Sequence, residues 1–336
     1  MAKQEERHID TIDDIARELG VSKTTVSRAI SGKGRLSTAT RAKVLAYIEA
    51  HNYRPNAVAK SLAKSKTYNL GLVLPVELME GETSFSQACM SGICEEASAR
   101  DYDVVLSMVS DQDTVQMERL INKRKVDGLI VSRSTVASPV VDLLKAREFP
   151  FITVGYTPDL TLLTVDNENR KACQDITRQL LDRGKRHLML LGGEENYYVT
   201  QERRMGFEEA HRQAGVPLSQ AQMFHEIKDI ETTRQAVDAA LEQGADCLVC
   251  MDDFICYLAL ILLRERQVSI PEDVSIVSFY DSRRLEYNTP PVASLWFDAK
   301  ALGKRACQML LAQLAGEDPQ SEVLPGYEIR WRGSVR

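Results

Sequence analysis

The chain has 336 residues, 44% hydrophobic and 27% charged, a composition typical of globular proteins. Its length allows two or three domains of about 100–200 residues each. No apolar run approaches the roughly 20 residues that span a bilayer, and the charged N-terminal segment lacks the apolar core of a secretory signal. We therefore expect a cytoplasmic protein that makes no membrane contact. The seven scattered cysteines predict free thiols rather than a disulfide framework.

Charge is unevenly distributed along the chain. Residues 1–66 contain 13 basic and 7 acidic residues, whereas the remaining residues contain 29 basic and 41 acidic ones. A basic segment on an acidic body favours an appended nucleic-acid-binding module.

Residues 11–50 predict three short helices, because Thr11, Ser22 and Ser37 each stand as an N-cap before a helical apolar pattern. Gly20 suits the end of the first helix. The apolar positions are Ile12, Ile15, Ala16 and Leu19 in the first helix, Val26 and Ile30 in the second, and Val44, Leu45 and Ile48 in the third. The second helix keeps an open polar face made of Lys23, Thr24, Ser27 and Arg28. This pattern is typical of a DNA-binding helix-turn-helix.

The segments TIDDIARELGVSKTTVSRAISGKGRLSTATRAKV and HNYRPNAVAKSLAKSKT resemble the headpiece and hinge of the lactose-repressor (LacI/GalR) family. The resemblance implies that Lys23, Thr24 and Arg28 read base edges. It places phosphate contacts or helix caps at Thr11, Ser22, Thr25, Ser27, Ser31 and Ser37. It also implies a hinge helix that orders on DNA, in which Asn56 belongs to the DNA-binding set, Ala59 contacts the partner hinge and Leu62 enters the minor groove.

From Asn69 onward, strand-like and helical patterns alternate, which predicts parallel, doubly wound α/β sheets in two lobes with a cleft between them. We expect strands at Asn69–Leu74, Val104–Val109, Gly128–Ser132, Phe151–Val154, His187–Leu191, Cys247–Met251, Ser275–Phe279 and Val292–Leu295. We expect helices near 86–100, 113–123, 170–183, 202–214, 232–243, 254–267 and 299–315.

No catalytic, cofactor or metal-binding constellation is evident in this body. Cys247 and Cys250 have the spacing of a metal or redox pair, but they lie in a predicted strand, where positions i and i+3 point to opposite faces. Gly192-Gly193 lacks the spacing of a phosphate-binding loop. We therefore expect no enzyme, no cofactor and no metal site.

The body also resembles the periplasmic-binding-protein-like core of the same family, through VDGLIV at 126–131, VDN at 165–167, RRMGF at 203–207, CMDD at 250–253 and SFYDS at 278–282. The resemblance implies an effector pocket formed by Phe85, Ser132, Arg203, Asp252, Asp281 and Phe297. Carboxylates, a guanidinium and aromatic rings would suit a sugar or sugar derivative. Asp253 beside Asp252 adds acidity, and Arg133 lies beside the predicted cleft.

These observations divide the chain into a helix-turn-helix headpiece (1–55), a hinge and linker (56–66) and an effector-binding and dimerisation core (67–336). Within the core, we expect one lobe at about 67–183 and 298–327 and the other at about 184–297 and 328–336. The C-terminal residues contain no leucine heptads, so we expect a homodimer rather than a coiled-coil tetramer.

We predict a repressor of sugar or carbon metabolism genes that a small-molecule effector releases from a palindromic double-stranded DNA operator. One alternative is a regulator that a co-repressor or partner protein activates. Alternatives of another class are a solute-binding protein and a sugar-processing enzyme on the same core fold.

Overall fold

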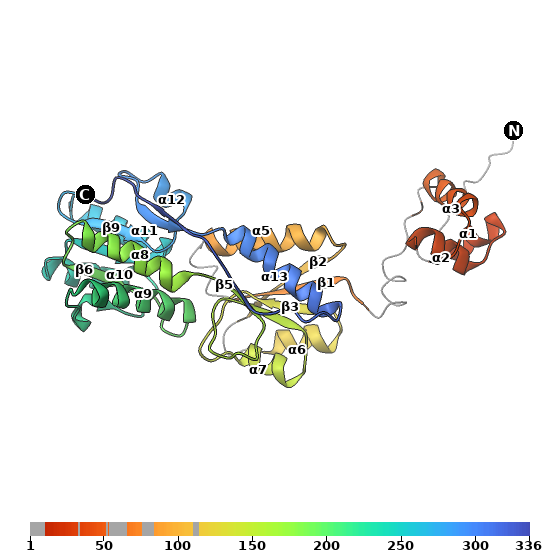
Figure 1. Cartoon of the computed structure of the whole chain (residues 1–336), viewed down its shortest axis with the longest axis horizontal. Helices are drawn as coiled ribbons and strands as arrows, with labels where there is room; N and C mark the ends of the chain where they lie inside the picture. Colours follow the sequence, from red (N-terminus) through yellow and green to blue (C-terminus); the bar gives the residue numbers. More distant parts are fainter. Residues whose placement is uncertain (1–10, 33, 52, 54–65, 76–83, 110–113) are drawn as a thin grey trace. The chain divides into compact units, whose positions relative to one another are not determined.

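The structure is a computed structural model that describes residues 11–32, 34–51, 53, 66–75, 84–109 and 114–336. The chain forms two units, Met1–Thr67, which contains the headpiece, and Tyr68–Arg336, which we call the core (Figure 1). The predicted hinge residues Asn56, Ala59 and Leu62 lie outside the described residues.

The headpiece contains the three predicted helices, α1 (Ile12–Leu19), α2 (Lys23–Ser31) and α3 (Thr38–Ala50). The side chains of Thr11, Ser22 and Ser37 each accept a hydrogen bond from the backbone N–H three residues later, which confirms the predicted caps. Gly20 ends α1 with φ of 64°, in the left-handed region that favours glycine.

A small apolar core joins these helices, formed by Ile15, Ala16, Val26, Ala29, Val44 and Tyr53. The prediction that Leu45 faces this core is wrong, because 43% of its surface is exposed. Successive helical residues are about 100° apart, so a helix that buries Val44 turns Leu45 away.

The first lobe of the core contains a parallel six-stranded sheet in the order β11-β5-β4-β3-β1-β2. Its strands are β1 (Asn69–Pro75), β2 (Asp103–Val109), β3 (Gly128–Val131), β4 (Phe151–Val154), β5 (Thr164–Asn167) and β11 (Glu322–Leu324). Helices α5 (Ser84–Ser98) and α13 (Ala299–Leu314) pack on one face, and α6 (Val115–Asn122) and α7 (Pro139–Ala146) pack on the other. A Cβ atom at Gly92 of α5 would lie only 2.0 Å from the Lys300 backbone oxygen, so glycine permits the close contact of α5 with α13.

The second lobe contains a six-stranded sheet in the order β12-β10-β9-β8-β6-β7. Its strands are β6 (Leu188–Leu191), β7 (Met223–Phe224), β8 (Cys247–Cys250), β9 (Ser275–Ser278), β10 (Ala293–Trp296) and β12 (Glu328–Arg330). Its helices are α8 (Asn169–Asp182), α9 (Tyr198–Ala214), α10 (Ile230–Glu242), α11 (Asp253–Glu265) and the short α12 (Arg283–Glu286). Right-handed crossovers place the α8–α9 pair and the α10–α11 pair on opposite faces.

The predicted two-lobed α/β fold is confirmed, with one refinement: β12 runs antiparallel to β10 at the sheet edge. All eight predicted strands are present within one or two residues. The short strands β5, β7, β11 and β12 and the helices α7 and α12 were not predicted from the sequence.

The first crossing between the lobes lies at Glu168, not near residue 183 as predicted. Strand β5 pairs within the first lobe, but α8 buries Ala172, Cys173 and Ile176 in the core of the second lobe. The physical reason is that the apolar stripe of α8 packs against α9 and not against the first sheet. The other two crossings lie at 297–298, between β10 and α13, and at 325–327, between β11 and β12.

The described residues contain neither a candidate membrane-spanning helix nor a candidate metal site. No helix within the described part of the chain is long and apolar enough to cross a bilayer. Cys247 and Cys250 are both buried in β8, and the described residues contain no grouping of His, Cys, Asp and Glu that could hold a metal ion.

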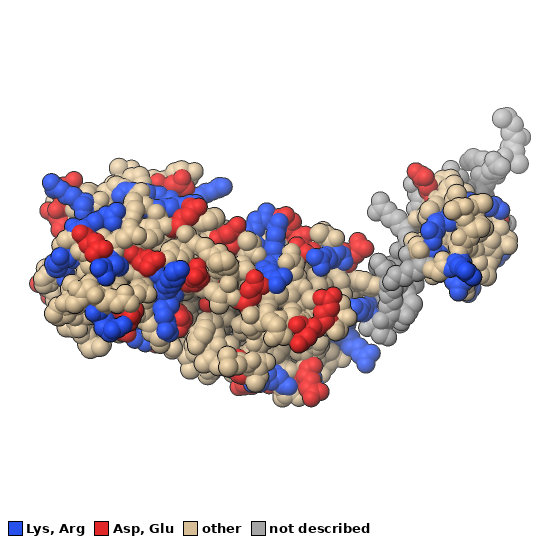
Figure 2. Space-filling view, viewed as in Figure 1, with Lys and Arg blue, Asp and Glu red and all other residues tan. Residues whose placement is uncertain are grey.

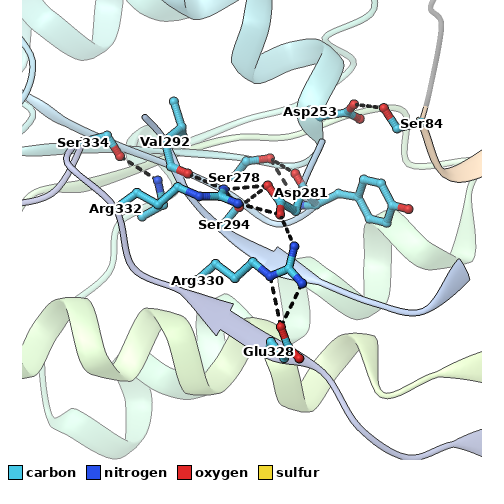
Figure 3. Close-up of polar contacts among 12 residues, drawn as sticks. Ser84, Asp253, Ser278, Asp281, Val292, Ser294, Glu328, Arg330, Arg332 and Ser334 are labelled. Carbon is cyan, nitrogen blue, oxygen red and sulfur yellow. Dashed lines mark hydrogen bonds and ion pairs between the residues drawn. The ribbon is translucent and has the colours of Figure 1, made fainter. Parts of the chain in front are cut away.

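A buried ion-pair network fixes the C-terminal segment to the second lobe (Figure 3). The two carboxylate oxygens of Asp281 accept hydrogen bonds from Arg332 at 2.7 and 2.9 Å and from Arg330 at 3.0 Å. The Ser294 hydroxyl donates to the same carboxylate at 2.7 Å. Burial alone would raise the pKa of Asp281, but these donors outweigh burial and lower it.

We expect Asp281→Asn to lower the free energy of unfolding by about 2–3 kcal/mol at pH 7, because it leaves Arg332 without its carboxylate partner and removes one of the two carboxylates that pair with Arg330. The pKa of Asp281 is lower in the folded state than its value of about 4 in the unfolded chain, so the ionised carboxylate stabilises the fold at pH values above about 4. This stabilisation is lost as the pH falls through the folded-state pKa. Urea unfolding of parent and variant should therefore show a difference that shrinks below about pH 4. Asp182→Asn, at an exposed pair with Arg178, is the matched control and should change little. Equal stability of parent and Asp281→Asn at pH 7 would contradict the network's structural role.

Candidate functional site

The open face of α2 presents polar side chains on a rigid support. Lys23, Thr24, Ser27 and Arg28 are exposed, whereas Val26 and Ala29 of the same helix are buried in the headpiece core. Thr25 is half-buried, and its hydroxyl lies 2.9 Å from the Ser22 hydroxyl at the helix start. The Ser31 side chain lies outside the described part of the structure. An exposed helix face of this kind has the shape and donors that enter a DNA major groove.

The N-termini of α2 and α3 are suited to anions. Neither helix has an acidic residue in its first turn, and a serine hydroxyl caps each. The positive end of the helix dipole and the free backbone N–H groups there attract phosphate. By contrast, α1 has Asp13 and Asp14 in its first turn. Figure 2 shows Lys and Arg as the main charged side chains on the visible face of the headpiece.

Two polar contacts orient this surface. Lys23 Nζ lies 2.6 Å from Asp13 Oδ1, although 70% of the Lys23 side chain stays exposed. One guanidinium nitrogen of Arg41 donates to the Gly32 carbonyl at 2.9 Å, which ties the end of α2 to α3. The position of α2 is therefore fixed by contacts within the headpiece.

The second candidate site is a cavity of about 760 Å³ between the two lobes of the core. This volume falls within the range of about 300–1,000 Å³ that is usual for small-molecule sites. Five of the six predicted effector residues line it, namely Phe85, Ser132, Arg203, Asp252 and Phe297. These residues come from both lobes, so a ligand in the cavity would contact both.

Asp281, the sixth predicted residue, is not part of the cavity lining. Its carboxylate is occupied by Arg330, Arg332 and Ser294 in the ion-pair network described above. The prediction that Asp281 and Arg203 point into one cleft is therefore wrong for Asp281. Two cations from the C-terminal segment, about 50 residues later in the chain, hold this carboxylate in the second lobe.

Arg203 is held in the cavity wall by hydrogen bonds to two other elements. Its Nε donates to Asn169 Oδ1 at 3.1 Å, and a terminal nitrogen donates to the Met251 carbonyl at 2.7 Å. The residue is only 8% exposed. These bonds fix the plane of the guanidinium. A planar guanidinium in a fixed orientation can direct its remaining N–H donors at a ligand.

Two buried carboxyl groups share this wall. Burial raises the pKa of Asp166 to about 7, although a hydrogen bond from the Asn167 backbone and the positive charge of Arg203 both lower this pKa in part. Burial and the nearby Asp252 raise the pKa of Asp253 to about 6, although Ser84 and Ser282 lie close enough to lower it in part. A buried carboxyl that is readily protonated can both donate and accept hydrogen bonds.

Several cavity-lining residues were not predicted as site residues. The most informative are Asp166, Asp253, Tyr197, Asp229 and Tyr280. Asp166 belongs to the VDN motif and Asp253 adjoins Asp252, so a signal existed for both. Tyr197 precedes α9 and has no such signal, whereas Asp229 caps α10 and forms a local cap pattern with Thr232 three residues later.

The lobes touch each other on two sides of the cavity. The Ser84 hydroxyl donates to Asp253 Oδ2 at 3.1 Å (Figure 3), and the Phe85 ring meets the Tyr280 ring edge-on at 5.8 Å. Elsewhere, the Val136 backbone N–H donates to the Asn196 carbonyl at 2.9 Å. These contacts join the two lobes beside the cavity.

Several curated proteins are similar to this chain over nearly its whole length. The HTH-type transcriptional regulator MalR of Staphylococcus xylosus is 28% identical over 92% of this chain and 92% of its own length. The regulator AglR of Rhizobium meliloti is 27% identical over 93% of this chain and 90% of its own length. Catabolite control protein A of Staphylococcus aureus is 26% identical over 97% of this chain and 99% of its own length.

Solved structures show the same fold. The transcriptional regulator CelR in complex with cellobiose matches with a TM-score of 0.73 and 24% identity, over 97% of this chain and 100% of that one. The lac repressor dimer bound to operator and the anti-inducer ONPF matches with a TM-score of 0.80 and 21% identity, over 96% of this chain and 98% of that one.

Two family descriptions account for most of the sequence. Residues 11–56 match the bacterial regulatory proteins of the lacI family. Residues 67–325 match the periplasmic binding proteins and sugar binding domain of the LacI family. The first range contains α2 with its exposed face, and the second contains the residues that line the interlobe cavity. The chain therefore belongs to the LacI family of bacterial regulatory proteins.

Proposed function

We propose that this protein is a dimeric, DNA-binding repressor of sugar or carbon metabolism genes, and that a sugar-like effector in the core releases it from a palindromic operator. The observation that carries the proposal is that one chain combines an exposed helix face bearing Lys23 and Arg28 with an interlobe cavity lined by charged, polar and aromatic side chains. As a DNA-binding regulator it would act in the cytoplasm. The curated relatives named above are regulators, and this favours a regulator over an enzyme or a solute-binding protein.

DNA recognition would divide between two kinds of contact. Lys23, Thr24 and Arg28 on the open face of α2 would contact base edges, since Lys and Arg donate to guanine and a Thr methyl packs on thymine. The N-termini of α2 and α3 would contact phosphates and set the register on the duplex. A two-fold dimer would read two half-sites, which accounts for a palindromic operator.

Release would depend on the equilibrium between lobe arrangements. The cavity is lined by both lobes, so an effector that binds one arrangement more tightly shifts the population toward it. The predicted hinge, residues 56–66, would connect headpiece and core, so a change in the core would alter its folding on DNA. A co-repressor would bind in the same cavity but would strengthen operator binding instead of weakening it.

The first test concerns base reading. Lys23→Gln should change which sequences are selected from a randomised operator library, because it removes a base-edge donor. Lys43→Gln on α3 is a matched control, since it removes the same charge from an exposed lysine and should leave sequence preference unchanged. Identical selected sequences for the parent protein and Lys23→Gln would rule out this role for Lys23.

The second test concerns the cavity. Ser132 Oγ is buried without a hydrogen-bond partner in the described structure, as is Ser107 Oγ in β2, but only Ser132 lines the cavity. Ser132→Ala should fold normally yet need about tenfold more effector for operator release, because a ligand hydroxyl loses its partner. Ser107→Ala should respond like the parent.

The measurement is operator release against concentration for any neutral sugar that releases the parent protein, with melting temperature as the folding control. Arg203→Ala, which removes a guanidinium from the cavity wall, should reduce the response more strongly than Ser132→Ala. Equal responses from Ser132→Ala and Ser107→Ala would show that the effector does not contact Ser132.

A further inference from the structure

The charged groups around the cavity follow a regular arrangement. Of the described residues that line it, five are acidic (Asp166, Glu194, Asp229, Asp252 and Asp253) and three are basic (Arg133, Arg203 and Lys228). Four helices of the second lobe, α8 to α11, begin at this cavity, because their first or second residues line it. Each of these helices has an acidic cavity-lining residue at or shortly before its N-terminus: Asp166 before α8, Glu194 before α9, Asp229 before α10 and Asp252 before α11.

Two of these carboxylates act directly as helix caps. Asp229 Oδ1 accepts from the Thr232 backbone N–H at 2.8 Å, and Asp252 Oδ1 accepts from the Ile255 backbone N–H at 2.9 Å. The Thr232 backbone and hydroxyl lower the pKa of Asp229, so this residue stays ionised at the cavity mouth. At each of these two helices, one backbone N–H that could bind a phosphate already donates to the protein's own carboxylate, whose negative charge also lies at the helix start.

The three basic residues are fewer than the five acidic ones, and each interacts with groups of the protein. Lys228 is exposed, and its charge helps to lower the pKa of the neighbouring Asp229. Two nitrogens of Arg203 donate to Asn169 and Met251, and the Arg133 guanidinium lies 4.7 Å from the centre of the Tyr197 ring. The raised pKa values of Asp166 and Asp253 show that the buried wall already disfavours the negative charge it carries. An anionic ligand group there would meet like charge, or would force these carboxyls to take up protons.

The remaining lining suits an uncharged ring compound. Phe85, Tyr280 and Phe297 form one aromatic wall, in which the Tyr280 and Phe297 rings are nearly parallel with centroids 6.4 Å apart. Such a wall can cover the apolar face of a sugar ring, while the carboxylates accept hydrogen bonds from its hydroxyls. The cavity volume of about 760 Å³ lies in the upper part of the usual range, which leaves room for more than one ring.

We propose that the effector is an uncharged sugar of two or more rings, and that the carboxylates at the helix N-termini exclude phosphorylated sugars. This inference rests on the proposed function, since it assigns the chemical class of the ligand that the cavity would bind. Asp229, at the cavity mouth, is the residue through which this selectivity can be tested with least disturbance.

The test compares matched neutral and phosphorylated probes on the full-length protein. Glucose, maltose, cellobiose, sucrose and trehalose are each measured beside their 6-phosphates, by the rise in melting temperature and by the change in operator binding. We expect at least one neutral disaccharide to bind, and its phosphate ester to bind at least about tenfold more weakly. A phosphate ester that binds as tightly as its neutral partner, or a panel in which no neutral disaccharide binds, would overturn the proposal.

A charge-removing variant tests the mechanism of exclusion. Asparagine caps helices about as well as aspartate, so Asp229→Asn keeps the α10 cap while it removes the charge. It should reduce the preference for the neutral sugar by about fivefold, the effect of one unit charge at close range in water. Glu242→Gln, an exposed residue at the other end of α10, is the matched control and should leave the preference unchanged. An unchanged preference in Asp229→Asn would refute the role of that carboxylate. Binding of the ligand-free protein to its operator, measured in the same assay, tests the proposed function separately.

Discussion

The buried guanidinium of Arg203 connects the elements that form the cavity wall of the second lobe. From α9 it donates to Asn169 at the start of α8 and to the Met251 carbonyl just after β8, and Asn169 in turn donates to Asp166 at 3.1 Å. A buried charge is tolerated only when it is hydrogen-bonded, so these partners constrain one another. The same contacts hold α8 against α9, where a Cβ atom at Gly206 would lie 2.2 Å from the Arg170 carbonyl oxygen. This packing is why α8 belongs to the second lobe, and why the chain crosses between lobes at Glu168.

Local signals were sufficient to predict much of this architecture. The three serine and threonine caps and the exposed face of α2 follow from short-range hydrogen bonding and helical periodicity, which depend on neighbours within about four residues. The longer strands were recognisable because they are continuous apolar runs. Strands such as β7, with two residues, and β11 and β12, with three each, were not recognisable, because pairing with a neighbouring strand defines them rather than their own sequence.

The candidate cavity shows the same limit. Family resemblance placed Asp281 at the right point of the chain, directly after the strand β9, but its side-chain direction is set by Arg330 and Arg332. Ion pairs between residues so distant in sequence leave no periodic pattern. Asp253 is similar, because its partner Ser84 lies in the other lobe, 169 residues away in the chain. Motif membership alone therefore does not decide which residues line the cavity, since Asp281 of SFYDS does not line it whereas Asp166 of VDN does.

Helix N-termini lie at both candidate binding surfaces, but the residues beside them differ in charge. In the headpiece, α2 and α3 begin with a neutral serine cap and carry no acidic residue in the first turn, so their positive ends are free to attract phosphate. In the core, the four helices that begin at the cavity have acidic residues beside their N-termini, and Asp229 and Asp252 cap two of these helices directly. The difference lies in residue choice and not in backbone geometry, since both sets of helices present N–H groups in the same way. A regulator of this kind needs a surface that binds the polyanion DNA and a cavity that stays available to a small effector. Neutral caps at the headpiece helices favour phosphate binding, and acidic residues at the cavity helices disfavour it.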